Sequence, residues 1–169
     1  MVVVDSSAII PLIKIGKLEL LKKSFKKIIV PEQVWQEIVI EGKKFNKPIK
    51  EFEDGRDKWY KVVNLDEKLE EEENLEKNDF IVFKIARDSK EILLTNDASL
   101  YYYALSQNVK CLWLTTLLLY ATRKKIITKN EAEDILLELV NTAGIHLKSD
   151  VLSELLVIIK NLNVEKNNS

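Results

Sequence analysis

The chain has 169 residues, 46% of them hydrophobic, which is enough to bury the core of one globular domain. Its 26 basic and 27 acidic residues give a formal net charge of −1, so the overall charge does not indicate a nucleic-acid-binding protein and any positive surface must be local. The single cysteine, Cys111, excludes an intramolecular disulfide and a cysteine-rich zinc site, as is typical of a protein of the reducing cytoplasm.

The amino-terminal segment predicts two buried strands, each followed by a helix. The first strand is "VVV", which ends at Asp5 before a helical pattern over residues 6 to 15. The second is "KKIIV", which leads into "PEQVWQEIVIEG". In that stretch Pro31 suits the first helical position and Gly42 suits the end of the helix, which carries Glu37.

The middle of the chain, residues 43 to 77, is highly charged. It contains "KWYKVVNL", a candidate strand, and "EKLEEEENLEKN", an acidic run. We assign the glutamates at 70 to 73 in this run to a solvated face or loop rather than to a metal site. The next stretch, "NDFIVFKIARDSK", has the apolar spacing of a helix, with Asn78 as its cap and Asp79 in its first turn.

Strand and helix patterns alternate after this point. "EILLTND" predicts a strand, "ASLYYYALSQN" a helix and "VKCLWL" another strand. With right-handed crossovers, the alternation predicts an α/β fold of three layers, α/β/α, in which a short parallel sheet is the middle layer. Further helices are predicted over residues 115 to 125, 128 to 142 and 149 to 161, the second of them opened by a capping box of Thr128 and Glu131.

Acidic residues follow two of the predicted strands. Asp5 comes directly after "VVV", and Asp97 comes just after "ILLT". Because ligands of an open parallel sheet bind outside the carboxyl ends of its strands, two aspartates delivered to that edge form a candidate site. Glu37 and Asp79 lie on neighbouring helices, and oxygen ligands without clustered histidine or cysteine suit a hard divalent cation, Mg²⁺ or Mn²⁺.

Each of these acids also has a purely structural interpretation. The three aspartates suit helix caps, first-turn positions or turns, and Glu37 suits the exposed face of an amphipathic helix. The small polar residues near the aspartates are assigned to capping and support rather than to chemistry: Ser6, Thr95 and Asn96.

Other catalytic arrangements have little support in the sequence. His146 is the only histidine, so a histidine-centred triad or a histidine-based zinc site would depend on it alone. The chain has no Walker-type phosphate loop, and its four glycines form no dinucleotide-binding fingerprint.

Four stretches together resemble the PIN-domain family of metal-dependent ribonucleases, in particular its subgroup with an extended helical carboxyl terminus. In chain order they are "VVVDSS", "PEQVWQEI", "LEKNDFIVFKIA" and "LLTNDASL". The resemblance implies that four acids bind metal and act in catalysis, namely Asp5, Glu37, Asp79 and Asp97. It also implies that Ser6 and Thr95 support these acids. The family often has a further acid just beyond the fourth, whereas Ala98 follows here, which puts a fully occupied second metal position in doubt.

The function that this resemblance implies is an Mg²⁺- or Mn²⁺-dependent endoribonuclease that hydrolyses RNA phosphodiester bonds. A divalent ion would bridge the acids and the phosphodiester, lower the pKa of a bound water and stabilise the developing charge. Toxins of toxin–antitoxin pairs and RNA-processing enzymes both belong to the family, so an antitoxin protein is one expected partner. Two alternatives stay open: a PIN fold that binds RNA or protein without catalysis, and a phosphotransfer α/β domain in which Asp5 becomes phosphorylated.

The resemblance also divides the chain. We expect a PIN-like nuclease domain over residues 1 to 125, a helical extension that packs on or continues the same domain over residues 126 to 161, and a disordered tail over residues 162 to 169.

Assembly and location are predicted from apolar surface. An apolar stripe near the carboxyl terminus predicts either a homodimer or packing on the chain's own domain. The stripe consists of Leu152, Leu155, Leu156 and Ile159. The first residues lack a signal peptide, and the most apolar stretch, residues 111 to 121, is too short to cross a bilayer. We therefore expect a cytoplasmic protein that makes no use of a membrane.

Overall fold

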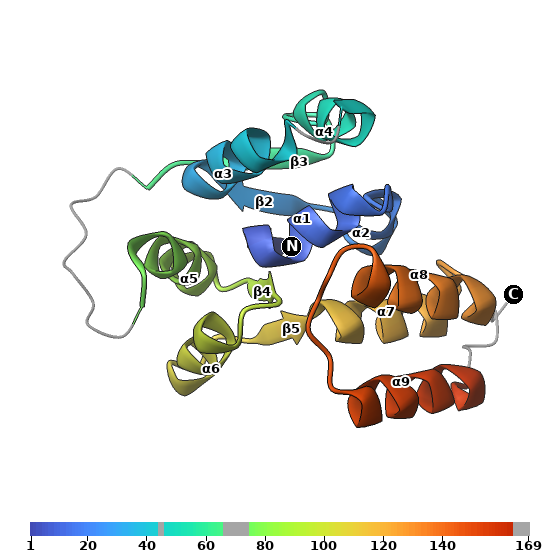
Figure 1. The fold of residues 1–169 in the computed structure, drawn as a ribbon. Helices are drawn as coiled ribbons and strands as arrows, with labels where there is room; N and C mark the ends of the chain where they lie inside the picture. Colours follow the sequence, from blue (N-terminus) through green and yellow to red (C-terminus); the bar gives the residue numbers. More distant parts are fainter. Residues whose placement is uncertain (44–45, 66–74, 164–169) are drawn as a thin grey trace, which may run out of the picture.

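Five short parallel strands form one sheet in the part of the chain that the computed structural model describes, residues 1–43, 46–65 and 75–163 (Figure 1). Their order across the sheet is β3-β2-β1-β4-β5, and each neighbouring pair is parallel. The predicted α/β fold with a short parallel sheet is therefore confirmed. The strands are β1 (Val2–Val4), β2 (Ile28–Pro31), β3 (Tyr60–Val63), β4 (Ile92–Thr95) and β5 (Cys111–Trp113).

Helices cover both faces of the sheet. The chain moves from β1 through β2 to β3 in one direction and returns through β4 to β5 in the other, so right-handed crossovers put the two sets of connecting helices on opposite faces. On one face lie α1 (Ser6–Lys14), α2 (Glu19–Ser24), α3 (Glu32–Gly42) and α4 (Asn46–Glu53). On the other lie α5 (Lys77–Ser89), which packs on β1, β2 and β4, and α6 (Ala98–Ser106), which packs on β5.

The carboxyl-terminal part of the described chain is helical, as predicted. It consists of α7 (Leu114–Arg123), α8 (Lys129–Asn141) and α9 (Ser149–Asn161). α7 packs on β5 and α2, α8 packs on α7, and α9 packs on α8, so the three helices extend the domain sideways (Figure 1). The capping box that opens α8 is confirmed: the Glu131 backbone N–H donates to Thr128 Oγ1 at 3.1 Å, and the Thr128 backbone N–H donates to Glu131 Oε2 at 2.7 Å.

β1 is the middle strand of the sheet and is buried along its whole length, and most of the neighbouring β4 is buried with it. Val2, Val3 and Val4 are completely buried, as are Leu93 and Leu94. Val4 pairs with Leu94, and the backbone N–H of the next residue, Asp5, donates to the Leu94 carbonyl at 3.0 Å. The ladder between β1 and β4 thus continues one residue beyond β1.

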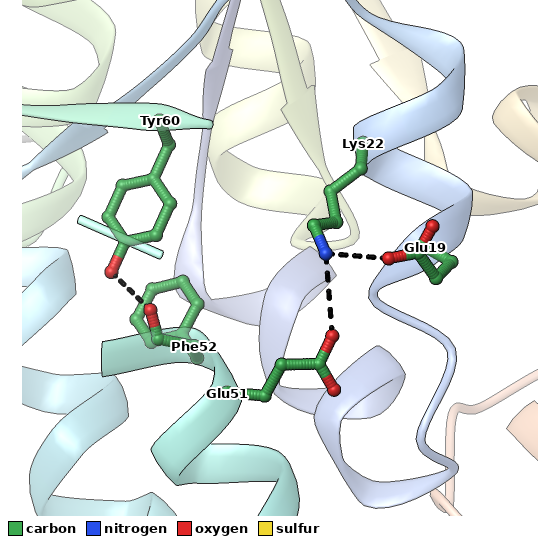
Figure 2. A network of polar contacts seen from close by, with 5 residues as sticks. All are labelled: Glu19, Lys22, Glu51, Phe52 and Tyr60. Atoms are coloured by element: carbon green, nitrogen blue, oxygen red, sulfur yellow. Dashed lines mark hydrogen bonds and ion pairs between the residues drawn. The ribbon is translucent and has the colours of Figure 1, made fainter. Parts of the chain in front are cut away.

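α4 lies in the charged middle segment, where the sequence predicted only a strand. Tyr60 on β3 attaches this helix to the sheet, because its hydroxyl donates to the Phe52 carbonyl at 2.7 Å (Figure 2). The same hydroxyl accepts the Trp35 indole N–H at 3.1 Å. The Tyr60 and Phe52 rings stack with centroids 4.8 Å apart. Burial raises the pKa of Tyr60 to about 12, so the hydroxyl stays protonated and able to donate at physiological pH.

An ion-pair group on the surface links α2 to α4. The Lys22 ammonium lies 2.6 Å from Glu19 Oε1 and 3.5 Å from Glu51 Oε1 (Figure 2). Exposed pairs of this kind contribute little to stability, so the buried Tyr60 contacts rather than these charges hold α4 in place.

The close approach of α4 to α3 explains Gly42. The sequence predicts this glycine as the end of a helix, and it is the last residue of α3. A Cβ atom at this position would lie within 2.3 Å of Ile49 Cδ1, so any larger residue would force the Ile49 side chain to move.

Two predicted helix starts are wrong in detail. Pro31 is the last residue of β2 and the cap of α3 rather than its first helical residue, because its ψ of 144° is extended. Asn78 lies inside the first turn of α5, whose cap residue is Glu76, while Asp79 is in the first turn as predicted. The glutamates at 70 to 73 lie outside the described residues.

The predicted apolar stripe of α9 packs on the chain itself. Ile159 is completely buried, and Leu152, Leu155 and Leu156 pack against the core. The homodimer and the division of the chain at residue 125 both stay predictions. Within the described residues, none of the helices is both long enough and apolar enough to cross a membrane.

Replacing Tyr60 with phenylalanine should destabilise the protein, because the Trp35 N–H loses its acceptor and the Phe52 carbonyl loses one donor. We expect Tyr60→Phe to lower the free energy of unfolding by about 1 kcal/mol, the net value of a typical hydrogen bond. Urea unfolding followed by circular dichroism measures the change. Tyr120→Phe, at an exposed tyrosine of α7, is the matched control and should leave the unfolding free energy unchanged within about 0.5 kcal/mol; equal values for the two variants would contradict this account of α4.

Candidate active site

Asp5 is a carboxylate held at the end of β1. It caps α1 with extended backbone angles, φ −87° and ψ 156°, and its side chain is only 3% exposed. Its Oδ2 accepts the Ser7 backbone N–H at 3.2 Å and also the Ser7 hydroxyl. A third donor, the Thr95 hydroxyl, reaches the same oxygen at 3.0 Å. All three bonds converge on Oδ2, and Oδ1 takes no part in them.

The same hydroxyls tie the end of β1 to the end of β4. Ser7 Oγ accepts the Asn96 backbone N–H at 2.8 Å, and Thr95 Oγ1 accepts the Asp97 backbone N–H at 3.0 Å. Asp97 in turn caps α6, because its Oδ1 accepts the Leu100 backbone N–H at 2.8 Å. Both aspartates therefore act as helix caps, which confirms the structural interpretation without excluding the chemical one.

All four predicted acids line one cleft of about 590 Å³ at this edge of the sheet. Asp5 and Asp97 come from the ends of β1 and β4, while Glu37 and Asp79 come from α3 and α5. The full lining comprises Asp5, Ser6, Ser7, Glu37, Leu75, Glu76, Asp79, Asp97 and Ser99. The four acids thus share one space, although they lie up to 92 positions apart in the chain, from Asp5 to Asp97.

The supporting residues have different positions. Ser6 lines the cleft and donates a side-chain hydrogen bond to Glu37. Thr95 is completely buried behind Asp5, and Asn96 contributes its backbone N–H rather than its side chain. The assignment of these residues to capping and support agrees with those contacts, whereas their part in a reaction stays a prediction.

Burial, together with neighbouring negative charge for two of them, raises the pKa of three carboxylates of the cleft. Burial raises the pKa of Asp79 to about 7, with further increases from the charges of Asp5 and Asp97. Burial also raises the pKa of Glu37, against the Ser6 hydrogen bond that lowers it. For Asp5, burial outweighs the hydrogen bonds from Ser7 and Thr95, so its pKa is raised as well.

Sequence reasoning missed two participants in this cleft. Glu76, the cap residue of α5, lines the cleft, and its charge raises the pKa of both Asp79 and Glu37. It lies inside the acidic run "EKLEEEENLEKN", of which the sequence analysis assigned only the glutamates at 70 to 73, and only its place directly before a helix marks it out. Ser7 was also missed, because the sequence singled out Ser6 of the "DSS" stretch and only the structure shows which hydroxyl reaches Asp5.

The chemistry of the cleft fits a hard divalent cation. Its donors are carboxylate and hydroxyl oxygens, the ligands that Mg²⁺ and Mn²⁺ prefer, and their mutual repulsion would be relieved by a positive ion. In the described part of the chain, no three His, Cys, Asp or Glu side chains are already arranged to hold an ion. A cation would therefore have to draw these acids closer together.

An open parallel sheet with an acidic cleft at the carboxyl ends of its central strands defines the class of this protein. The family model DUF3368, described as a PIN domain, matches residues 1–161. The chain belongs to the PIN-domain family, as its sequence motifs predicted.

One solved structure supports the fold, and a second is a weaker match. A PilT N-terminus domain protein from the hyperthermophilic archaeon Sulfolobus solfataricus P2 superimposes with a TM-score of 0.55 at 16% identity, over 71% of this chain and 92% of that one. A domain of a functionally unknown protein from Methanocaldococcus jannaschii matches with a TM-score of 0.45 at 22% identity, over 66% of this chain and 89% of that one. No protein with a curated description matches the chain.

The raised pKa of Asp79 predicts how the metal-free protein responds to pH. The folded state holds a proton on Asp79 up to about pH 7, whereas the unfolded chain releases it near 3.8, so the unfolding free energy contributed by this group falls as pH rises between these values. Because asparagine does not titrate, Asp79→Asn removes this pH-dependent decrease in the free energy of unfolding. In EDTA, the melting temperature of the variant relative to wild type should therefore rise from pH 5 to pH 8.

Differential scanning calorimetry at the two pH values measures this difference. Asp88→Asn, at an exposed aspartate of the same helix that does not line the cleft, is the control and should show no such rise. A pH-independent difference between wild type and Asp79→Asn would show that the pKa of Asp79 is not raised in the folded protein.

Proposed function

We propose that this protein is an Mg²⁺- or Mn²⁺-dependent endoribonuclease that hydrolyses RNA phosphodiester bonds. One observation carries the proposal: four carboxylates from β1, α3, α5 and β4 line a single cleft, and the pKa of Asp79 is raised to about 7 by burial and by the other acids. Such repulsion costs stability in the metal-free protein, which is expected where a fold retains acids to bind a cation. Membership of the PIN-domain family supports the same conclusion.

The acids that would hold the cation are Asp5, Glu37, Asp79 and Asp97, with Glu76 at the edge of the cleft. When bound, a divalent ion supplies charge neutralisation for the phosphodiester and lowers the pKa of a coordinated water. The chain's own hydrogen bonds orient the ligands: Ser7 and Thr95 hold Oδ2 of Asp5, and the Leu100 N–H holds Oδ1 of Asp97. Asp79, with a pKa of about 7, is able to take up or release a proton near neutral pH.

Single-stranded or looped RNA is the substrate that we propose. Double-stranded RNA presents its phosphates along a stiff helix, whereas an unpaired strand is able to bend its backbone into a cleft and expose its bases. We place the activity in the cytoplasm, where Cys111, half-buried and with its pKa raised to about 11 by burial, would stay a thiol.

A role as the toxin of a toxin–antitoxin pair is the cellular function that we propose, with RNA processing as the other role open to this family. A toxin requires a protein partner, and α9 exposes two large apolar side chains, Val157 and Ile158, that would suit a contact with one. An adjacent gene for a short DNA-binding protein would favour the toxin. A homodimer stays part of the proposal and is tested by light scattering at micromolar concentration.

A non-catalytic PIN module is the second candidate. One observation favours it: among the described residues, no three acids are arranged to hold an ion without movement. The phosphotransfer alternative has less support, because Asp5 is 3% exposed and one of its oxygens already accepts three hydrogen bonds.

The Asp97→Asn variant separates the capping role from the chemical role. An asparagine oxygen still accepts the Leu100 N–H, so α6 keeps its cap, but the cleft loses one charge. With Mn²⁺ and a pool of single-stranded RNAs, we expect wild type to cleave and Asp97→Asn to cleave at least about 10- to 100-fold more slowly, as when a group that orients or forms a metal site is lost. Neither protein should cleave in EDTA.

The control for this assay is Asp150→Asn. Asp150 lies in the first turn of α9, its carboxylate also accepts a backbone N–H, and it does not line the cleft. This variant should cleave at the wild-type rate. Wild-type cleavage that persists in EDTA, or full activity of Asp97→Asn, would refute the proposed mechanism; absence of cleavage over varied RNA pools would leave the binding module.

A further inference from the structure

Three aromatic side chains form a cluster at the carboxyl end of β5. The Tyr101 and Trp113 rings stack with centroids 4.1 Å apart and planes 19° from parallel. Tyr102 meets both rings edge-on, with centroids 5.5 Å from Tyr101 and 6.4 Å from Trp113. We refer to Tyr101, Tyr102 and Trp113 as the aromatic cluster.

The aromatic cluster adjoins the acidic cleft. Trp113, the last residue of β5, pairs with Thr95, the residue that holds Asp5. On α6, Ser99 lines the cleft, and Tyr102 follows it by three residues, so the two side chains are neighbours on one face of the helix. The rise between them is about 4.5 Å, at 1.5 Å per residue. The cluster is thus the next surface beyond Ser99.

The packing of α6 against the rest of the chain does not explain why a large aromatic side chain is exposed at Tyr102. The neighbouring Tyr103 turns inward, where its ring meets Phe83 of α5 edge-on at 5.0 Å. The half-buried stack of Tyr101 and Trp113 already joins α6 to β5. Tyr102 is 66% exposed, so most of its ring is left for contact with another molecule. Large rings exposed beside a cleft are typical of recognition surfaces.

We propose that the aromatic cluster binds unpaired bases of a single-stranded RNA whose backbone enters the acidic cleft, with Tyr102 as the principal stacking residue. This inference rests on the proposed function of the cleft. Aromatic rings bind bases of any sequence, because every base has a flat π face, and they leave the phosphates free to reach a neighbouring site. The cleft is rich in carboxylates, so it attracts no phosphate by itself, and uncharged stacking on the adjacent rings supplies affinity that is independent of the metal.

Removing the Tyr102 ring should weaken RNA binding without changing the cleft. Stacking of a base on an aromatic ring adds to binding affinity, and for one exposed ring we expect Tyr102→Ala to raise the dissociation constant for a single-stranded decanucleotide roughly 5- to 30-fold. Tyr102→Phe, which keeps the ring, should bind like wild type. Tyr120→Ala removes a tyrosine that is 41% exposed on α7 and outside the aromatic cluster, and it should also bind like wild type.

A scan with abasic RNA tests whether the ring contacts a base. The full chain carrying Asp79→Asn, which the proposed function predicts to be inactive, is titrated in Mg²⁺ with decanucleotides that each lack one base at a successive position. One or two positions should weaken binding when the base is missing, and the same positions should have no effect when Tyr102→Ala is added. Steady-state cleavage in the otherwise unaltered chain should show a raised KM and an almost unchanged kcat for Tyr102→Ala.

The outcomes test RNA binding by the aromatic cluster separately from RNA cleavage by the acidic cleft. Identical abasic profiles with and without the Tyr102 ring, or unchanged affinity of Tyr102→Ala, would overturn the RNA-binding role of the cluster and leave a protein partner as its occupant, while cleavage by the cleft would stand. Base-dependent binding without metal-dependent cleavage would support the cluster and overturn the nuclease. Failure of the otherwise unaltered chain to bind single-stranded RNA would overturn both.

Discussion

The hydrogen bonds around Asp5 are the interaction on which the site depends. A carboxylate that is 3% exposed is costly unless its oxygens are satisfied, and here the Ser7 and Thr95 hydroxyls and the Ser7 backbone N–H all donate to one oxygen. The same two hydroxyls accept backbone N–H groups from residues 96 and 97, which follow β4. This network fixes the carboxyl ends of the neighbouring strands β1 and β4, and the caps of α1 and α6, relative to each other.

The fold then gathers further charge around Asp5 instead of dispersing it. Glu37 and Asp79 arrive from helices on opposite faces of the sheet, and Glu76 lies at the start of the same helix as Asp79. Desolvation and mutual repulsion raise the pKa of Asp79 to about 7. A protein with no use for this arrangement would gain stability from neutral residues, so a cation is the simplest compensating charge. Under the proposed metal-binding role, the stability of the fold and the chemistry of the site are coupled, since a ligand that binds the native state adds stability that grows with its affinity and concentration.

The sequence predicted the strands and their parallel arrangement because these features depend on local patterns, and the four acids that it singled out line one cleft, while their role in metal binding and catalysis stays a prediction. "VVV" and "ILLT" are short apolar runs that end in aspartate or lead to it, and they form the paired, largely buried strands β1 and β4. It did not predict α4, because Ile49 and Phe52 are embedded among charges and the helix is stabilised by a remote residue, Tyr60. Ser7 and Glu76 were missed for a related reason: which of two serines reaches a carboxylate, and which of many glutamates faces the cleft, is decided by backbone geometry rather than by composition.

The central claim is that these acids together form a site for one divalent cation, and calorimetric titration of the metal-free protein with Mn²⁺ at pH 7 tests it most directly. Repeating the titration in two buffers with different heats of ionisation counts the protons released, and Asp79→Asn identifies their source. The account predicts saturable binding that releases protons, because ligands must be deprotonated and Asp79 holds a proton up to about pH 7. It also predicts weaker binding and less proton release for Asp79→Asn. Absence of saturable binding, or binding and proton release that Asp79→Asn leaves unchanged, would contradict it.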